Sequence, residues 1–194
     1  TRPTPEALSW AFVLDKQVMT VDDSNPAKND VIKLFKEAEY LQFKKFFDDA
    51  IVLYGTIINL KPEKGLLSEV YRIRGSLYSE NKKDYAKAIE DFNKSLEIDA
   101  QSAMTYVLRG TVYNELNDYP KAIADFTKSL ELDTQLANTY MLRGIAYNGQ
   151  KNHAKAIADF TKSLEINSQS AIVYRLRAAV YAGQNNYTKA LEDF

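Results

Sequence analysis

The chain has 194 residues, no cysteine, and 25 lysines and arginines against 26 aspartates and glutamates, which leaves a net charge of -1. This composition excludes disulfides, thiolate chemistry and cysteine-ligated zinc, and it lacks the basic excess typical of a nucleic-acid binder. With 45% hydrophobic residues and no apolar run near the roughly 18 residues of a membrane span, a soluble protein is expected, and the cytoplasm is the favoured compartment.

Residues 1–30 are predicted to form an N-terminal segment followed by a linker. In "TPEAL", Thr4 is placed to cap a helix whose first position is Pro5, and apolar residues continue this helix to about Met19. An extended strand through "AFVL" is the alternative. The stretch "TVDDSNPAKND" from Thr20 is typical of a linker, with Asp30 as the cap of the next helix.

The rest of the chain consists of repeats. Aligned on a recurring small residue, "YRIRG", "YVLRG", "YMLRG" and "YRLRA" return with a period of 34 residues, and the first of these units carries one extra residue. Each unit contains two amphipathic stretches separated by a turn such as "NDYP". The predicted units are 31–64, which is divergent, 68–102, 103–136, 137–170 and the partial unit 171–194.

Side chains of one kind recur at fixed positions, numbered from the first residue of each unit. Positions 4 and 11 are Tyr, position 8 is small, position 20 is Ala and position 24 is aromatic. Positions 4, 8 and 11 lie on one helical face, and positions 20, 24, 27 and 28 lie on one face of the next helix. The small residues at positions 8 and 20 allow two helices to approach closely, as in a helical hairpin.

This pattern resembles the tetratricopeptide repeat, a 34-residue helix-turn-helix unit, over residues 31–194. The resemblance implies an all-α fold, a right-handed α-solenoid (superhelix) of stacked antiparallel helix-turn-helix units. The chain departs from the family pattern in its Arg at position 7 and in the missing closing Pro of the later units. Because solenoids need a polar capping helix and none follows Phe194, we expect the natural chain to continue past residue 194.

The recurring arginine at position 7 needs a counter-charge, because it borders the apolar stripe where a lone cation is costly. Every unit with this arginine has Asp at position 23, whereas the divergent unit has Glu37 and Leu53 at these places. We predict structural ion pairs, within a hairpin or across adjacent units; ligand binding by the arginines is the alternative. The pairs are Arg74 with Asp91, Arg109 with Asp125, Arg143 with Asp159, and Arg177 with Asp193.

Residues that suggest chemistry repeat with the scaffold. All tyrosines except Tyr40 fall at repeat positions 4, 11, 17 or 24, so we assign them to the core rather than to base stacking. The one histidine, His153, replaces a tyrosine at position 17, and one His without Cys builds no usual metal site. The glycines occur singly and form no phosphate-binding loop. We therefore predict no enzyme, no catalytic residue, no metal and no cofactor.

By resemblance, a partner binds the concave surface of the first helices through positions 2, 5, 9, 12 and 13. The centre of this surface is apolar and contains Met, and two Asn in register are suited to hold an extended backbone. A neutral or amphipathic peptide or helix is the expected ligand, and contact with solvent or with the N-terminal segment is the alternative. The peptide-binding residues are Arg72, Met104, Val107, Thr111, Asn114, Asn138, Met141, Ile145, Asn148 and Arg175.

The predicted function is a non-catalytic scaffold or adaptor for protein–protein interaction. Self-association through terminal hairpins or the N-terminal segment, giving a homo-oligomer, is the alternative, and RNA or DNA binding is a further one that the charge disfavours. Some members of the family hold the C-terminal carboxylate of chaperones with a clamp of Lys, Asn and Arg. No window supplies that clamp, since position 5 reads Phe35, Arg72, Val107, Met141 and Arg175.

Overall fold

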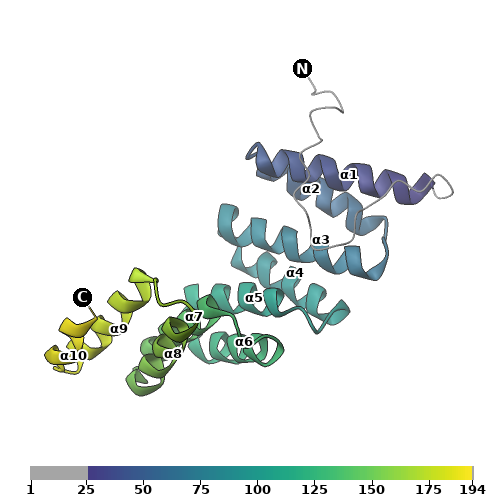
Figure 1. The fold of residues 1–194 in the computed structure, drawn as a ribbon. Coiled ribbons are helices and arrows are strands. Elements are labelled where there is room, and N and C mark those ends of the chain that lie inside the picture. The colour runs from purple at the N-terminus through teal and green to yellow at the C-terminus, as the bar shows by residue number, and fades with distance from the viewer. Residues whose placement is uncertain (1–25, 194) are drawn as a thin grey trace.

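The computed structural model describes residues 26–193, and it is all-α (Figure 1). The helix and strand considered for residues 4–19 lie outside this range. The first helices of successive hairpins are α1 (Pro26–Phe43), α3 (Lys64–Leu77), α5 (Ala103–Glu115), α7 (Ala137–Gly149) and α9 (Ala171–Gly183). The second helices are α2 (Phe47–Asn59), α4 (Tyr85–Ile98), α6 (Tyr119–Leu132), α8 (His153–Ile166) and α10 (Tyr187–Glu192).

Helix α1 begins earlier than the sequence indicated. It starts at Pro26, so Asp30 lies inside the helix and the predicted linker to residue 30 is too long by about one turn. Proline is well suited to a first helical position because its fixed φ matches the helix and its missing N–H has no intrahelical partner there. The prediction that Asp30 caps this helix is therefore wrong.

Side-chain caps fix the start of the second helices in the later units. Asp84, Asp118, Asn152 and Asn186 each accept a hydrogen bond from the backbone N–H three residues on. This satisfies one of the free amides of the first helical turn. In the first unit the same place is held by Phe46, which makes no cap hydrogen bond.

Three of the hairpins, α3–α4, α5–α6 and α7–α8, are held by close contact between a glycine and an aromatic ring. A methyl group added at Gly144 would come within 2.7 Å of Cε1 of Phe160, and Gly75 and Gly110 face their own phenylalanines in the same way. These phenylalanines are almost fully buried. The apolar stripe of the second helix thus packs against a first helix that has no side chain at the crossing point.

The extra residue of unit 68–102 is absorbed in a wide turn, the π-helical segment η2 (Tyr78–Lys82). The carbonyl of Tyr78 accepts from the N–H of Asp84, six residues on, whereas the carbonyl of Tyr113 accepts from Asp118, five residues on. The turn ends at Lys83, whose φ of 55° lies in the left-handed region. The insertion therefore stays within the turn, and the register of α4 against α3 is kept.

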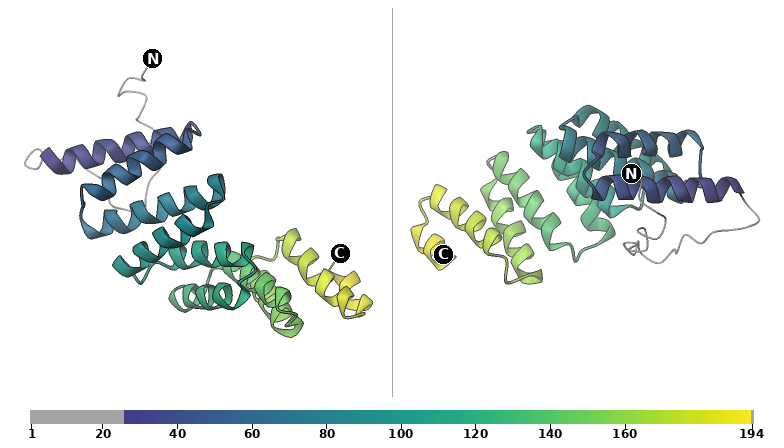
Figure 2. Two further views of the ribbon diagram at one scale, coloured as in Figure 1. Left: turned by 180° about the vertical axis from the view of Figure 1, so that it is seen from behind. Right: turned by 90° about the horizontal axis from the view of Figure 1, so that it is seen from above.

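Successive hairpins stack in chain order, each second helix against the next first helix, and the stack curves (Figures 1 and 2). The first helix α7 also contacts the first helices on either side of it, α5 and α9. Within residues 26–193, no pair of second helices makes as many contacts with each other. The first helices therefore lie on the inner, concave side. None of the helices in this range is long and apolar enough to cross a membrane.

Candidate functional site

The structure brings each recurring arginine together with its aspartate. Nε and Nη2 of the arginine donate to the two carboxylate oxygens of the aspartate in the same hairpin, over distances of 2.6–2.9 Å. Of the side-chain surface, 17–20% is exposed in the arginines and 4–9% in the aspartates. These are bidentate, mostly buried pairs between the two helices of a hairpin.

Three of the arginines also reach the preceding unit. Nη1 of Arg109, Arg143 and Arg177 donates to the side-chain oxygen at position 25 of the hairpin before, over 2.6, 3.1 and 2.8 Å. The acceptors are Asn93, Thr127 and Thr161. Of the two geometries left open for the Arg–Asp pair, the one within a hairpin occurs in all four units. The bond across the stack goes to a neutral acceptor and was not predicted.

Tyrosine rings cover the same guanidinium groups. Each arginine lies 5.5–5.8 Å from the ring centroid of the tyrosine at position 4 of its own helix. The tyrosines at positions 4 and 11 are half-buried beside these cations, and Tyr78, Tyr113 and Tyr147 at position 11 also pack against the core. The assignment to the core is confirmed for the fully buried Tyr54 at position 24, and it is wrong for Tyr187 at position 17, which is exposed. The hydrogen bond to the aspartate raises the pKa of each arginine. These groups are occupied within the stack rather than presented to a ligand.

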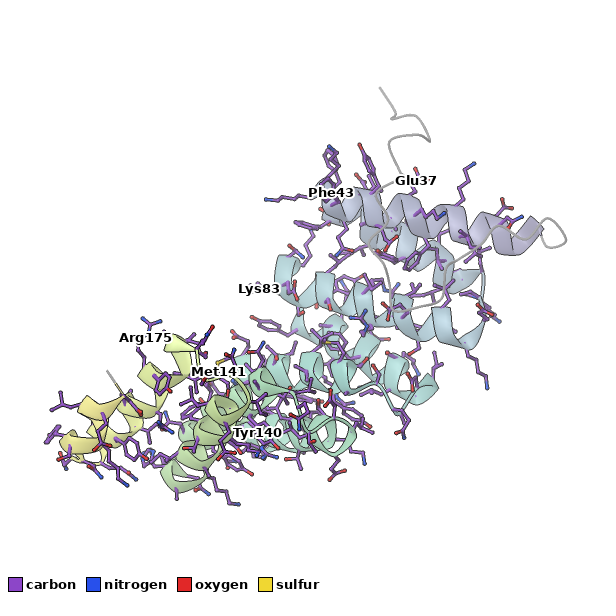
Figure 3. All side chains as sticks on the ribbon, viewed as in Figure 1. Glu37, Phe43, Lys83, Tyr140, Met141 and Arg175 are labelled. Carbon is purple, nitrogen blue, oxygen red and sulfur yellow. The ribbon has the colours of Figure 1, made fainter. Side chains whose placement is uncertain are left out.

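The predicted groove residues fall into two groups by exposure. Met104, Asn138 and Arg175 are exposed, as is Asn148, whereas Val107, Met141 and Ile145 are half-buried. Val107 packs against the core beside α6, and the other two pack against the core shared by α8 and α9. Met141 on α7 and Arg175 on α9 lie on the same inner side of the curve (Figure 3).

Several polar groove residues are already engaged. Arg72 pairs with Glu69 on the same helix, and the hydroxyl of Thr111 donates to the carbonyl of Val107. Oδ1 of Asn148 lies 3.0 Å from Nδ1 of His153, which gives that histidine a structural contact. Oδ1 of the matching residue Asn114 is enclosed without a partner, because position 17 of its unit is Tyr119. The exposed apolar side chains are therefore the freest part of this surface.

The interface between units contains a position that sequence reasoning missed. Position 3 of the first helices, which is Val70, Thr105, Thr139 and Val173, is buried. Oγ1 of Thr105 lies 3.3 Å from Oγ of Ser95 in the preceding unit, and Ser95 in turn contacts Ser68. The restriction of position 3 to Val and Thr was the available signal, since both are β-branched and nearly equal in shape.

The ordered stacking of helical hairpins defines an α-solenoid. No group of three or more His, Cys, Asp or Glu able to hold a metal occurs in the part of the chain that the structure describes. Family models described as "Tetratricopeptide repeat" match residues 68–102 and 101–169, together more than half of the chain. The chain belongs to the tetratricopeptide-repeat family, whose members are generally non-catalytic modules for protein–protein interaction.

Solved structures share this fold at low sequence identity. A crystal structure of MamA shares 24% identity, covers 81% of this chain and 90% of its own, and gives a TM-score of 0.76. The structure of residues 41 to the end of MamA from Desulfovibrio magneticus RS-1 shares 19% identity, covers 85% of this chain and 92% of its own, and gives a TM-score of 0.78. YrrB, described as "a TPR protein with an unusual peptide-binding site", shares 21% identity. Its structure covers 88% of this chain and 85% of its own, and gives a TM-score of 0.72. No curated protein matches.

Proposed function

We propose that this protein is a scaffold or adaptor that binds a peptide or helix of a partner protein along the concave face of α5, α7 and α9. One observation carries the proposal: apolar side chains on this face remain accessible although the repeats are fully stacked. Met104 is 55% exposed and Ile172 is 49% exposed, at the same repeat position of α5 and α9. Helix α7, which contacts both α5 and α9, carries the half-buried Met141 and Ile145, and we assign these four side chains to one apolar strip.

The chemistry of this strip suits an adaptable protein contact. Methionine is unbranched and polarizable, and it repacks readily against different apolar surfaces. A helix or extended segment that covers the strip would bury its apolar side chains, which is the main favourable term in most protein association. The peptide-binding site described for YrrB is a property of that protein, and it agrees with a binding role for the same fold here.

The test should change exposed groove residues rather than packed ones. Replacing Met141 or Ile145 by a charged residue would also disturb the core around Phe160, so lost binding would have two explanations. The variant Met104→Glu with Ile172→Glu leaves that core intact. A matched control is Val52→Glu, which replaces a 66% exposed apolar residue on the outer helix α2.

We expect wild type and the Val52→Glu variant to retain the same partners in quantitative affinity purification, and the double groove variant to lose them. Circular dichroism melts of the three proteins should agree to within a few degrees, because surface changes shift stability by only about 0.5 kcal/mol. Equal recovery of partners by the groove variant would contradict the proposal.

Self-association is a second candidate for the chain of residues 1–194, whose last hairpin presents apolar side chains. Tyr187 and Leu191 are 61% and 74% exposed, whereas the matching Tyr119 and Ile123 are half-buried beneath the next hairpin. Analytical ultracentrifugation over a range of concentrations tests this surface by comparing wild type with Leu191→Lys. A second comparison removes residues 1–25 only, since α1 begins at Pro26.

A further inference from the structure

The concave face differs in charge between its two ends. At position 9 the first unit has Glu39, where the later units have the uncharged Ser76, Thr111, Ile145 and Ala179. At position 5 the last unit has Arg175, which is exposed and forms no ion pair within residues 26–193. The apolar strip of α5, α7 and α9 lies between an acidic end at α1 and α3 and a basic end at α9.

The acidic end holds two half-buried carboxylates, of which one forms an ion pair within residues 26–193. Glu39 and Glu69 are both half-buried, and the one cation paired with them is Arg72, which binds Glu69. Burial raises the pKa of Glu39, and the charge of Glu69 adds to this effect while that of Lys36 opposes it. The hydroxyl of the neighbouring Tyr54 donates to Gln42. Burial is the main cause that raises the pKa of Tyr54, and the negative charges of Glu39 and Glu69 raise that pKa further.

A half-buried carboxylate without a cation is costly, and an incoming cation removes that cost. The outer side of the same helix offers no such site. Glu37 is exposed on α1, and solvent screens its charge (Figure 3). The difference between Glu39 and Glu37 is thus one of environment, not of residue type.

Resting on the proposed function, we propose that the groove binds its partner segment in one orientation. A lysine, arginine or free amino group of the partner lies at Glu39 and Glu69, and the apolar residues of the partner lie over Met104, Met141 and Ile172. Arg175 faces the opposite, neutral or acidic end of the segment. Complementary charge of this kind fixes register and suppresses reversed binding more than it adds affinity.

Selection of random peptides displayed on phage tests the orientation without a known ligand. The full chain is immobilised as wild type, as Glu39→Gln, as the matched control Glu37→Gln on the same helix, and as the groove variant Met104→Asp. We expect wild type and Glu37→Gln to enrich apolar peptides with Lys or Arg at one end. Glu39→Gln should enrich apolar peptides without that basic end, and Met104→Asp should enrich neither.

A selected basic-ended peptide is then synthesised with Lys or Arg, and again with Gln at those places, for fluorescence anisotropy. Loss of one partly exposed ion pair should weaken binding of the basic peptide to Glu39→Gln roughly fivefold, and should leave the Gln peptide unchanged. Neutral or acidic-ended peptides selected by wild type, or equal affinity for Glu39→Gln, would overturn the orientation while leaving the groove intact. Failure of wild type to enrich any peptide above bare support, or undiminished binding by Met104→Asp, would overturn the proposed function itself.

Discussion

The first hairpin and the four later hairpins join their two helices by different means. In the later units an Arg–Asp pair crosses the hairpin beside a Gly or Ala. In the first unit these places hold exposed Glu37 and half-buried Leu53, and Tyr54 packs edge-on to Phe35 at 5.9 Å between ring centroids. A tight hairpin therefore does not need the ion pair.

The difference shows what the arginine adds. In α5, α7 and α9 its third nitrogen donates to the preceding hairpin, so one side chain joins the two helices of a unit and the unit before. The first hairpin has none before it in the described residues, and it has no arginine at this position. In these three helices the arginine therefore adds a contact between units to the pair within its own unit, whereas Arg74 of α3 makes only the pair within its unit.

The largest expected effect comes from breaking one pair in a later unit. Arg143→Met leaves the Asp159 carboxylate buried without a counter-charge, which should lower the free energy of unfolding by about 3 kcal/mol. Adding Asp159→Leu copies the apolar choice of the first unit and should recover most of the loss, because buried pairs exchange for apolar residues at little cost. Denaturant melts of both single variants and the double variant measure this. Additive losses would show that the two residues are not coupled.

The next effect concerns the close approach of helices in a later hairpin. Gly144→Ala places a methyl group against the buried ring of Phe160, and overpacking of this kind should cost about 2 kcal/mol. Gly183→Ala is the control, because nothing lies within 4 Å of its added methyl group and alanine favours the helix. In thermal melts, the midpoint temperature of Gly144→Ala should lie below that of wild type, and that of Gly183→Ala should equal or exceed it. The reverse order would contradict the packing argument.

Giving the first hairpin the cap of the later ones should stabilise it. Phe46→Asp places a carboxylate where Asp118 and Asn152 accept a backbone hydrogen bond in their units. The expected gain is about 1 kcal/mol in the free energy of unfolding. Phe46→Ala removes the same exposed ring without supplying an acceptor, so equal stability of the Asp and Ala variants would argue against capping.

The arginine of unit 68–102 is the one without an acceptor in the preceding hairpin. A side chain added at Gly55 would begin 3.4 Å from Nη1 of Arg74, the place that Asn93 or Thr127 occupies for the next arginines. Gly55→Thr supplies a hydroxyl there, and Gly55→Val supplies the same shape without it. We expect Thr to be more stable than Val by roughly 0.5–1 kcal/mol in chemical denaturation. A more stable Val variant would exclude the hydrogen bond.

The smallest expected effect is a pH dependence that separates the helix capped by an ionisable Asp, α6, from the helix capped by a neutral Asn, α8. The hydrogen bond from the Lys121 side chain lowers the pKa of Asp118, while Asn152 at the same position does not titrate. A lowered folded pKa gives stability that is present above the unfolded pKa and is lost as pH falls through the folded pKa. Hydrogen exchange, corrected for intrinsic rates, should therefore show the first turn of α6 opening between about pH 5 and pH 3, and that of α8 unchanged. Asp118→Asn should abolish the difference; equal opening of both turns in wild type would contradict it.

Sequence periodicity predicted the repeats because the spacing of small and aromatic residues reflects local helical geometry. Gly144 and Phe160 lie in one hairpin, so their contact follows from two helical faces and a short turn. The joint loss of Arg and Asp in unit 31–64 likewise indicated which charges pair. The start of α1 at Pro26 was missed because linker-like composition from Thr20 onward outweighed the proline at the first helical position.

The sequence by itself determined the family, the hairpin unit and the aspartates as the counter-charges of the arginines, because all three follow from positions that recur within one repeat. The structure decided that each pair lies within one hairpin. Tertiary structure decided what depends on how one hairpin is rotated against the next. That rotation buries Thr105 and Thr139 and brings Thr127 to Arg143. It also sets the half-buried environment of Glu39, since a carboxylate acquires its strength as a binding group from its surroundings and not from its place in the repeat.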